Sequence, residues 1–221
     1  MKITTAVFAV LALATPVAAQ NFDVVLGGKT LGWMAIDTRG AGQLRTTLDN
    51  TPLGVFNGTF EGTRRTSGAG TTTFTGISRS SRKSRTVSVN FSEGRATGVD
   101  VEPASERTAL SDIAQVPAAV TDPITALGAL VHANGCPPAQ RIYEGRRVIA
   151  LIPEPAERNG VLLVCSVSYR VIAGPGHLSP LRISSARMRL TYAVSGSRQT
   201  LRQIHLSSGI FSVSINRASG S

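Results

Sequence analysis

The chain is poor in aromatic residues and has no long apolar run after its N-terminus. Phe, Trp and Tyr together make up only 5% of its 221 residues, whereas a membrane-spanning β-barrel carries aromatic girdles at both lipid interfaces. No later apolar stretch approaches the roughly 18 residues that a membrane-spanning helix needs. These absences disfavour both kinds of membrane span and favour a soluble protein.

The N-terminus has the order of features found in a cleavable export signal. Lys2 precedes a nine-residue apolar run, and Val17-Ala18-Ala19 fits the small-x-small rule of signal peptidases. We therefore expect residues 1–19 to be a signal peptide, cut after Ala19, that directs the protein to the periplasm. A buried N-terminal helix is the alternative interpretation. The remaining residues, 20–221, have a length that favours a single domain.

Cysteine is scarce, and the chain has only two, Cys136 and Cys165. In an oxidising compartment an even count favours one disulfide bond between them. A metal-binding pair is the alternative, but two thiols without a second cysteine pair make a poor zinc site. We therefore predict the disulfide and no metal.

Acidic residues are outnumbered by basic ones. The chain has 13 Asp and Glu against 23 Lys and Arg, a formal net charge of +10. A basic surface attracts anionic partners through long-range fields, and it also keeps a small domain soluble. For an exported protein, the anions within reach are lipopolysaccharide, anionic lipids and cell-wall polymers, so we expect no nucleic acid partner.

Motifs of catalysis and cofactor binding are missing. No Gly-x-Ser-x-Gly sequence marks a hydrolase nucleophile. Gly28-Lys29-Thr30 matches only the end of a phosphate-binding loop, because Asp23 stands where the first glycine is required. The three histidines, His132, His177 and His205, lie far apart, so they could form a metal site only if the fold assembled it. The sequence therefore predicts no cofactor.

Short alternating segments separated by Gly-rich and Pro-rich turns predict about twelve strands. Residues 86–91 are the clearest example, because Val87, Val89 and Phe91 share one face. We expect Pro153-Glu154-Pro155 to interrupt the chain between two later strands. Many short strands with glycine at the turns indicate a mainly β protein, either a strongly curved antiparallel sheet or an open β-barrel.

One helix is predicted, over about residues 122–133. Asp122 followed by Pro123 is a typical helix start, because the first side chain caps the helix and proline suits the first position. Asn134-Gly135 ends it. Its apolar residues fit one helix face: Ile124, Leu127, Leu130 and Val131. We expect this central α-helix to lie in the concavity of the sheet.

Four cations and no acid occur between residues 78 and 85: Arg79, Arg82, Lys83 and Arg85. Three of them share the parity of Val87 and Val89, so one regular strand would turn three charges toward the core at high cost. We predict instead a solvated hairpin connection at residues 80–84, with Arg79 and Arg85 near its rim. The alternatives are that the four cations contact an anion, or that they form an inward-facing basic lining.

Three further residues receive structural interpretations. Trp33, the only tryptophan, is expected in the core rather than as a stacking platform. His177 lies in a loop rich in glycine and proline and is expected to be solvated. Glu144 lies in a turn, where a solvated role is ordinary.

Short motifs in the second half of the chain occur in a recognisable order: Asp122-Pro123-Ile124-Thr125-Ala126-Leu127, Gly135-Cys136-Pro137, Arg141-Ile142-Tyr143-Glu144-Gly145-Arg146-Arg147, Cys165 and Tyr169-Arg170-Val171-Ile172-Ala173-Gly174. This order resembles the exported proteobacterial family known as domain of unknown function 3108, over roughly residues 22–216. That family usually has Asp where Glu144 stands, which argues against catalysis by this carboxylate. The resemblance implies a periplasmic, strand-rich protein and no established activity.

Three functions follow as hypotheses. The first is a non-enzymatic cell-envelope protein that binds an apolar or lipid-like ligand in the concavity of a curved sheet. The second is a binder of an anionic envelope polymer or lipopolysaccharide through an Arg-rich surface. The third is an enzyme acting on a glycan or peptide, with a site that is assembled only in three dimensions.

Overall fold

A curved antiparallel sheet with one helix in its concavity makes up the fold. The computed structural model describes residues 19–54, 56–177 and 182–219, so the predicted signal peptide, apart from Ala19, lies outside the described residues. Within them, 13 strands form a single sheet: β1 (Gln20–Leu26), β2 (Lys29–Asp37), β3 (Gln43–Leu48), β4 (Gly58–Thr66), β5 (Thr72–Ser80), β6 (Ser84–Ser92), β7 (Arg95–Glu102), β8 (Gln140–Tyr143), β9 (Val148–Asn159), β10 (Leu162–Ala173), β11 (Ser185–Ser195), β12 (Arg198–Ser208) and β13 (Phe211–Arg217). The predicted fold class is confirmed.

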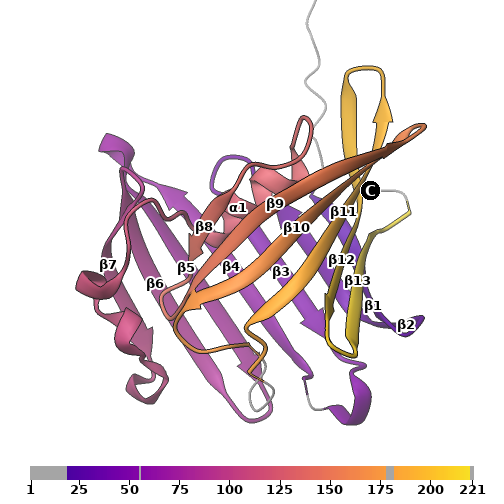
Figure 1. Cartoon of the computed structure of the whole chain (residues 1–221). Helices are drawn as coiled ribbons and strands as arrows, with labels where there is room; N and C mark the ends of the chain where they lie inside the picture. The colour runs from indigo at the N-terminus through magenta and orange to yellow at the C-terminus, as the bar shows by residue number, and fades with distance from the viewer. Residues whose placement is uncertain (1–18, 55, 178–181, 220–221) are drawn as a thin grey trace, which may run out of the picture.

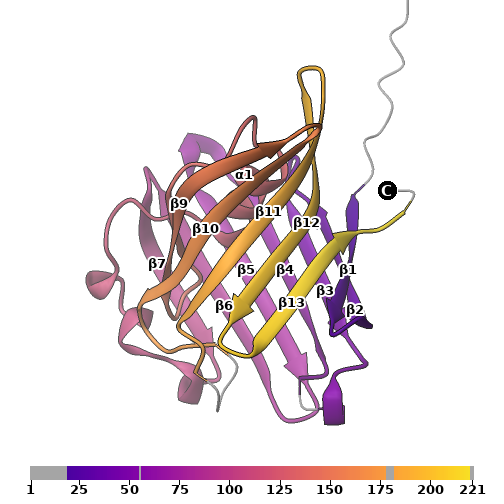
Figure 2. The same cartoon turned by 45° about the vertical axis from the view of Figure 1, so that its right-hand side comes forward.

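The strand order shows how the two halves of the chain are joined. Strands β1 to β7 form one meander and β8 to β13 form another, and β1 pairs with β13 to join them. The sheet therefore ends at β7 and β8, and its curvature brings these two ends toward each other (Figures 1 and 2). The result is a nearly closed barrel.

The gap between the two ends of the sheet is bridged by the chain that enters the helix. Val120 N–H donates to the Gly94 carbonyl at 3.0 Å, and Thr121 N–H donates to the Arg141 carbonyl at 2.9 Å. Thr121 in turn accepts from Tyr143 N–H at 3.0 Å. Because these backbone groups of β8 are paired, this edge does not offer an open ladder to another chain.

Helix α1 (Pro123–Val131) lies inside the concavity, as predicted (Figure 1). The Asp122 carboxylate accepts from the backbone N–H groups of Ile124 and Thr125, both at 2.9 Å, which caps the first turn. Ile124 and Leu130 are buried against the sheet. From the far wall, the buried Tyr192 hydroxyl donates to the Leu130 carbonyl at 2.7 Å and holds the other end of the helix.

The region between β7 and β10 begins with 3₁₀ turns, among them Ala109–Ser111 and Ile113–Gln115. One sequence expectation about this region is corrected. Strand β9 continues through Pro153 and Pro155, where an interruption was expected. Beyond Leu151, β9 pairs with β10 alone, and a register shift lies opposite the prolines. Proline is tolerated there because an edge strand does not need every backbone donor.

Trp33 is not a core residue, contrary to expectation. Its side chain is 43% exposed on the outer face of β2, whereas Met34 and Ile36 point inward. A register shift between β1 and β2 places Val24 opposite Gly32 and Val25 opposite Thr30. The strand keeps its alternation after the shift, so the tryptophan falls on the outer side.

The predicted pairing of the cysteines is confirmed. A disulfide joins Cys136, which follows α1, to Cys165 on β10, with Cα atoms 5.5 Å apart. Cys165 is fully buried in the core. The bond therefore ties the segment after the helix to the wall of the barrel. Within the described residues, no helix is both long and apolar enough to cross a membrane.

Candidate ligand-binding site

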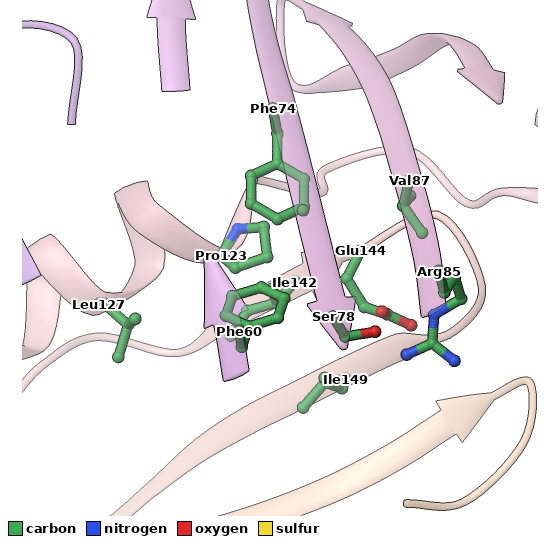
Figure 3. A pocket seen from close by; sticks show the side chains of 11 residues that line it. Phe60, Phe74, Ser78, Arg85, Val87, Pro123, Leu127, Ile142, Glu144 and Ile149 are labelled. Atoms are coloured by element: carbon green, nitrogen blue, oxygen red, sulfur yellow. The ribbon is translucent and has the colours of Figure 1, made fainter. Parts of the chain in front are cut away.

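A cavity of about 210 Å³ lies between α1 and the two ends of the sheet (Figure 3). Strands β4, β5 and β6 form one wall, and β8 and β9 form the other. Its lining is mostly apolar: Phe60, Phe74, Gly76, Val87, Pro123, Leu127, Ile142 and Ile149, with Ser78, Arg85 and Glu144 as the polar members. Figure 3 shows the polar side chains together at one end, away from Leu127.

Two glycines shape the apolar wall. Gly62 on β4 and Gly76 on β5 are register partners. A Cβ atom at Gly62 would lie 3.2 Å from the Phe60 ring, and one at Gly76 would lie 3.1 Å from the Phe74 ring. The absent side chains leave room for both rings to lie over the strand backbone. The wall is therefore aromatic and yet leaves space beside the helix.

The polar end of the cavity is organised by Glu106, which lies in the segment that follows β7. Its carboxylate accepts from Lys83 Nζ at 2.9 Å and from Arg85 Nη1 at 3.0 Å, and it lies 3.2 Å from Arg146 Nη2. The hydrogen bond from Lys83 is the largest of the interactions that hold the pKa of Glu106 below its ordinary value, although partial burial opposes them. Glu106 is therefore the anionic centre of a three-cation cluster.

A second ion pair follows β8. Glu144 Oε1 accepts from Arg147 Nε at 2.9 Å, and both side chains are largely buried, at 22% and 7% exposed. Burial raises the pKa of the Glu144 carboxyl, although the nearby Arg147 opposes this rise. Arg147 Nη1 is buried and forms no hydrogen bond within the described residues. The expectation that Glu144 is solvated is therefore wrong.

The turn at residues 144–147 is fixed by the segment that follows β7. Thr108 Oγ1 donates to the Arg146 carbonyl at 2.9 Å, and Ser111 Oγ donates to the Gly145 carbonyl at 3.2 Å. Gly145 has a φ of +92°, and a Cβ there would lie 2.2 Å from Val87. Only glycine fits this close approach to β6. The tight turn holds Glu144 at the end of the cavity.

His177 and Tyr169 form a half-buried pair close to the Arg147 charge, joined by a hydrogen bond between the Tyr169 hydroxyl and His177 Nε2. Burial lowers the pKa of His177 to about 4, and the charges of Arg147 and Arg85 lower it further in the same direction. Burial also raises the pKa of Tyr169. Both side chains are therefore neutral near pH 7, and the expectation that His177 is solvated is wrong.

The charged cluster carries an excess of positive charge. We define it as the six side chains at and behind the polar end of the cavity: Lys83, Arg85, Glu106, Glu144, Arg146 and Arg147. Four cations face two carboxylates, and both carboxylates are engaged by cations. Among the described residues, no group of three potential metal ligands gathers in one place. The arrangement suits a ligand with an apolar part and a polar or anionic end.

The structure separates the four cations of residues 78–85. The hairpin connection lies where predicted, because Ser80 N–H donates to the Lys83 carbonyl at 2.8 Å and β6 begins at Ser84. Arg79 and Arg82 are exposed. Lys83 is 70% exposed. Arg79, Arg82 and Lys83 therefore match the expectation of a solvated tip, and Lys83 also pairs with Glu106.

Arg85 departs from the solvated rim position that was expected for it. It continues the inward-facing positions of β6 and lines the cavity, with 26% of its side chain exposed. The inward position was expected to be costly because a charge that faces the core without a partner is poorly solvated. Glu106 pairs with Arg85, so this cost is largely avoided. Glu106 itself was not a candidate in the sequence, because nothing in its spacing links it to residues 83 and 85. In the sequence, Arg146 and Arg147 were noted only as members of the 141–147 motif that resembles domain of unknown function 3108, and no role was predicted for them.

Comparison of the chain with protein-family models, curated protein sequences and solved structures gives no match in any of the three. The resemblance to domain of unknown function 3108 therefore stays a prediction. The functional interpretation depends on the geometry of the cavity and on the distribution of charge.

Proposed function

We propose that this chain is an exported, non-enzymatic protein of the periplasm or cell envelope that holds an apolar or lipid-like ligand in the concavity of its sheet. The observation that carries the proposal is the apolar cavity lined by Phe60, Phe74 and Leu127, which lies beside a helix that does not fill it. Concave, mostly apolar sites with a few polar groups are the usual form of small-molecule sites. The N-terminal sequence and the disulfide support export.

The size of the cavity limits the ligand. Its volume of about 210 Å³ is below the roughly 300–1,000 Å³ of typical ligand pockets. The cavity therefore accepts a small apolar group or part of an acyl chain. A larger lipid requires α1 to move away from the β4–β5 wall, and the ligand would then shift the protein toward that open state.

Displacement of a fluorescent fatty-acid probe tests this function, together with native mass spectrometry of protein purified from its own periplasm. Leu127→Trp replaces an aliphatic side chain by a bulky indole ring in the cavity and should abolish probe binding. Val161→Trp, at a position 70% exposed, is the matched control and should bind like the unmodified protein. Ligand-free protein from the native source, together with no probe binding, would count against the proposal.

A second candidate function has a specific observation in its favour. The chain from residue 160 to 221 contains seven arginines and no Asp, Glu or Lys. On the outer face of β11, Arg187 lies opposite Ser168 and Ser207, and Arg189 lies opposite Ser166 and His205. This surface, with the exposed Arg170 and Arg202 on the flanking strands, is the basic outer face.

Binding of an anionic envelope polymer or lipopolysaccharide through the basic outer face is therefore the second proposal. Hydroxyl groups beside guanidinium groups supply additional hydrogen-bond donors for phosphate or sulfate oxygens. Arg187→Gln with Arg189→Gln should weaken binding to lipopolysaccharide and reduce its salt dependence. Arg79→Gln with Arg82→Gln makes the same charge change at the hairpin tip and is the control. Equal losses in the two double variants would argue against a defined surface.

The enzymatic hypothesis gains no support from the charged cluster. Glu106 is held by three cations, and Glu144 is held by Arg147. A glycosidase needs one carboxyl group as acid and another as base or nucleophile, and both of these groups are already engaged. We propose no reaction.

A further inference from the structure

We infer that the ligand of the cavity is an amphipathic carboxylate, whose anionic head binds Arg85 while its apolar chain lies against Phe60 and Phe74. This inference rests on the proposed function and adds the chemical class of the ligand. It is drawn from the position of Arg85, from the charge balance of the charged cluster and from the polarity gradient along the cavity.

Arg85 has unused hydrogen-bonding capacity at the cavity. A guanidinium group carries five N–H donors. Arg85 uses Nη1 on Glu106, and its other two nitrogens form no hydrogen bond within the described residues. The side chain is 26% exposed and lines the cavity. Arginine binds carboxylates well because two parallel N–H groups match the two oxygens.

The charge balance of the charged cluster favours an anion over a neutral or cationic head. Two carboxylates offset only two of its four cations. His177 adds no further positive charge near pH 7 because its pKa is about 4. Partly buried like charges repel one another strongly, since the surroundings screen them less than water does. A bound carboxylate relieves part of this repulsion.

The arrangement of side chains gives the ligand a direction. Figure 3 shows Ser78, Glu144 and Arg85 gathered at one end of the cavity, with the Phe60 ring and Leu127 toward the other. The Ser78 hydroxyl adds a donor beside Arg85. Glu144 is the one lining group that repels an anion, and its contact with Arg147 at 2.9 Å offsets this charge. The head therefore binds at the Arg85 side of this end.

Calorimetric titration with octanoate and with octanol tests the inference on the full chain. The two probes share a chain length and differ in head group. The unmodified protein should bind octanoate about 10- to 100-fold more tightly than octanol, as expected for a hydrogen-bonded charge pair. Arg85→Gln should remove this preference, so that octanoate and octanol bind with similar affinity. Arg85→Lys keeps the positive charge and should retain part of the preference.

Arg79→Gln is the matched control, because Arg79 lies at the end of the adjacent strand on the outer face. It should alter neither titration. Thermal unfolding of each variant shows whether loss of the Glu106 contact has disturbed the fold. Arg85→Lys should keep the fold undisturbed, because lysine can still pair with Glu106, so this variant tests the head-group contact even if Arg85→Gln unfolds.

The outcomes of these titrations distinguish the proposed function, binding of an apolar ligand, from the inference that this ligand has a carboxylate head. If octanol binds the unmodified protein as tightly as octanoate does, the carboxylate head is wrong and the apolar-ligand function stands. If both probes bind and Arg85→Gln preserves the preference for octanoate, Arg85 is not the head-group contact. If neither probe binds, the proposed function fails together with the inference.

Discussion

The charged cluster and the basic outer face use the same residue type in opposite ways. In the charged cluster, Arg85 and Arg146 pair with a single carboxylate and are largely withdrawn from solvent. On the basic outer face, Arg187 and Arg189 are exposed and form no ion pair with a described carboxylate. The comparison shows that a net charge of +10 does not describe one surface. Part of it surrounds a cavity, and part of it faces outward.

The largest expected effect comes from removing the anionic centre of the charged cluster. Glu106→Gln leaves Arg85 and Arg146 without a compensating charge, and breaking such a buried pair costs about 3–5 kcal/mol. Urea unfolding should show a loss of about 3 kcal/mol, since Lys83 stays hydrated. Asp100→Asn is the control, because Asp100 and its partner Arg107 are both more than half exposed. An equal loss in both variants would show that the partly buried ion pairs of Glu106 contribute no more to stability than the exposed pair of Asp100 and Arg107.

The next effect depends on pH and concerns His177, which lies beside the charged cluster. Its folded pKa is about 4 against an ordinary value of 6.5, so the unfolded chain takes up the proton first as the pH falls. The stabilisation is complete above pH 6.5 and is lost as the pH falls toward 4, by about 2 kcal/mol once partial exposure is allowed for.

His177→Gln should flatten this pH dependence, because glutamine does not titrate and can still hydrogen-bond Tyr169. The measurement is the free energy of unfolding at several pH values between 7 and 4, compared between the variant and the unmodified chain. Parallel curves would show that His177 is not the residue that titrates in this window.

The smallest effect on stability is expected on the basic outer face. Arg187→Gln with Arg189→Gln removes two exposed like charges, so the free energy of unfolding should change by less than about 0.5 kcal/mol. The same double variant should lose affinity for lipopolysaccharide. A large loss of stability would show that these arginines have structural partners and are not a binding surface.

The sequence predicted the fold better than it predicted the cavity. Strand alternation, as at Val87 and Val89, and the Asp122-Pro123 helix start depend on neighbouring residues, so they could be read directly. The pairing of the cysteines followed from their even number and from the expected oxidising compartment. The expectation for Trp33 failed because a register shift in β2 decides which face the residue takes, and such a shift has no strong sequence signal.

The charged cluster could not be predicted because its members come from separated segments. Glu106 lies 21 residues from Arg85 and 40 from Arg146, and only the curvature of the sheet brings these segments together. The sequence showed four cations near residues 78–85 and no acid, which made inward placement seem too costly. The correct placement of Arg85 required knowledge of a distant carboxylate.

The most direct test of the central claim is a crystal structure of the protein purified from its native source, inspected for density in the cavity. The account predicts continuous density between the Phe60 and Phe74 wall and α1, with one end within hydrogen-bonding distance of Arg85. A cavity that contains only ordered water, or one filled by Leu127 and its neighbours, would contradict the claim that the concavity holds an apolar ligand.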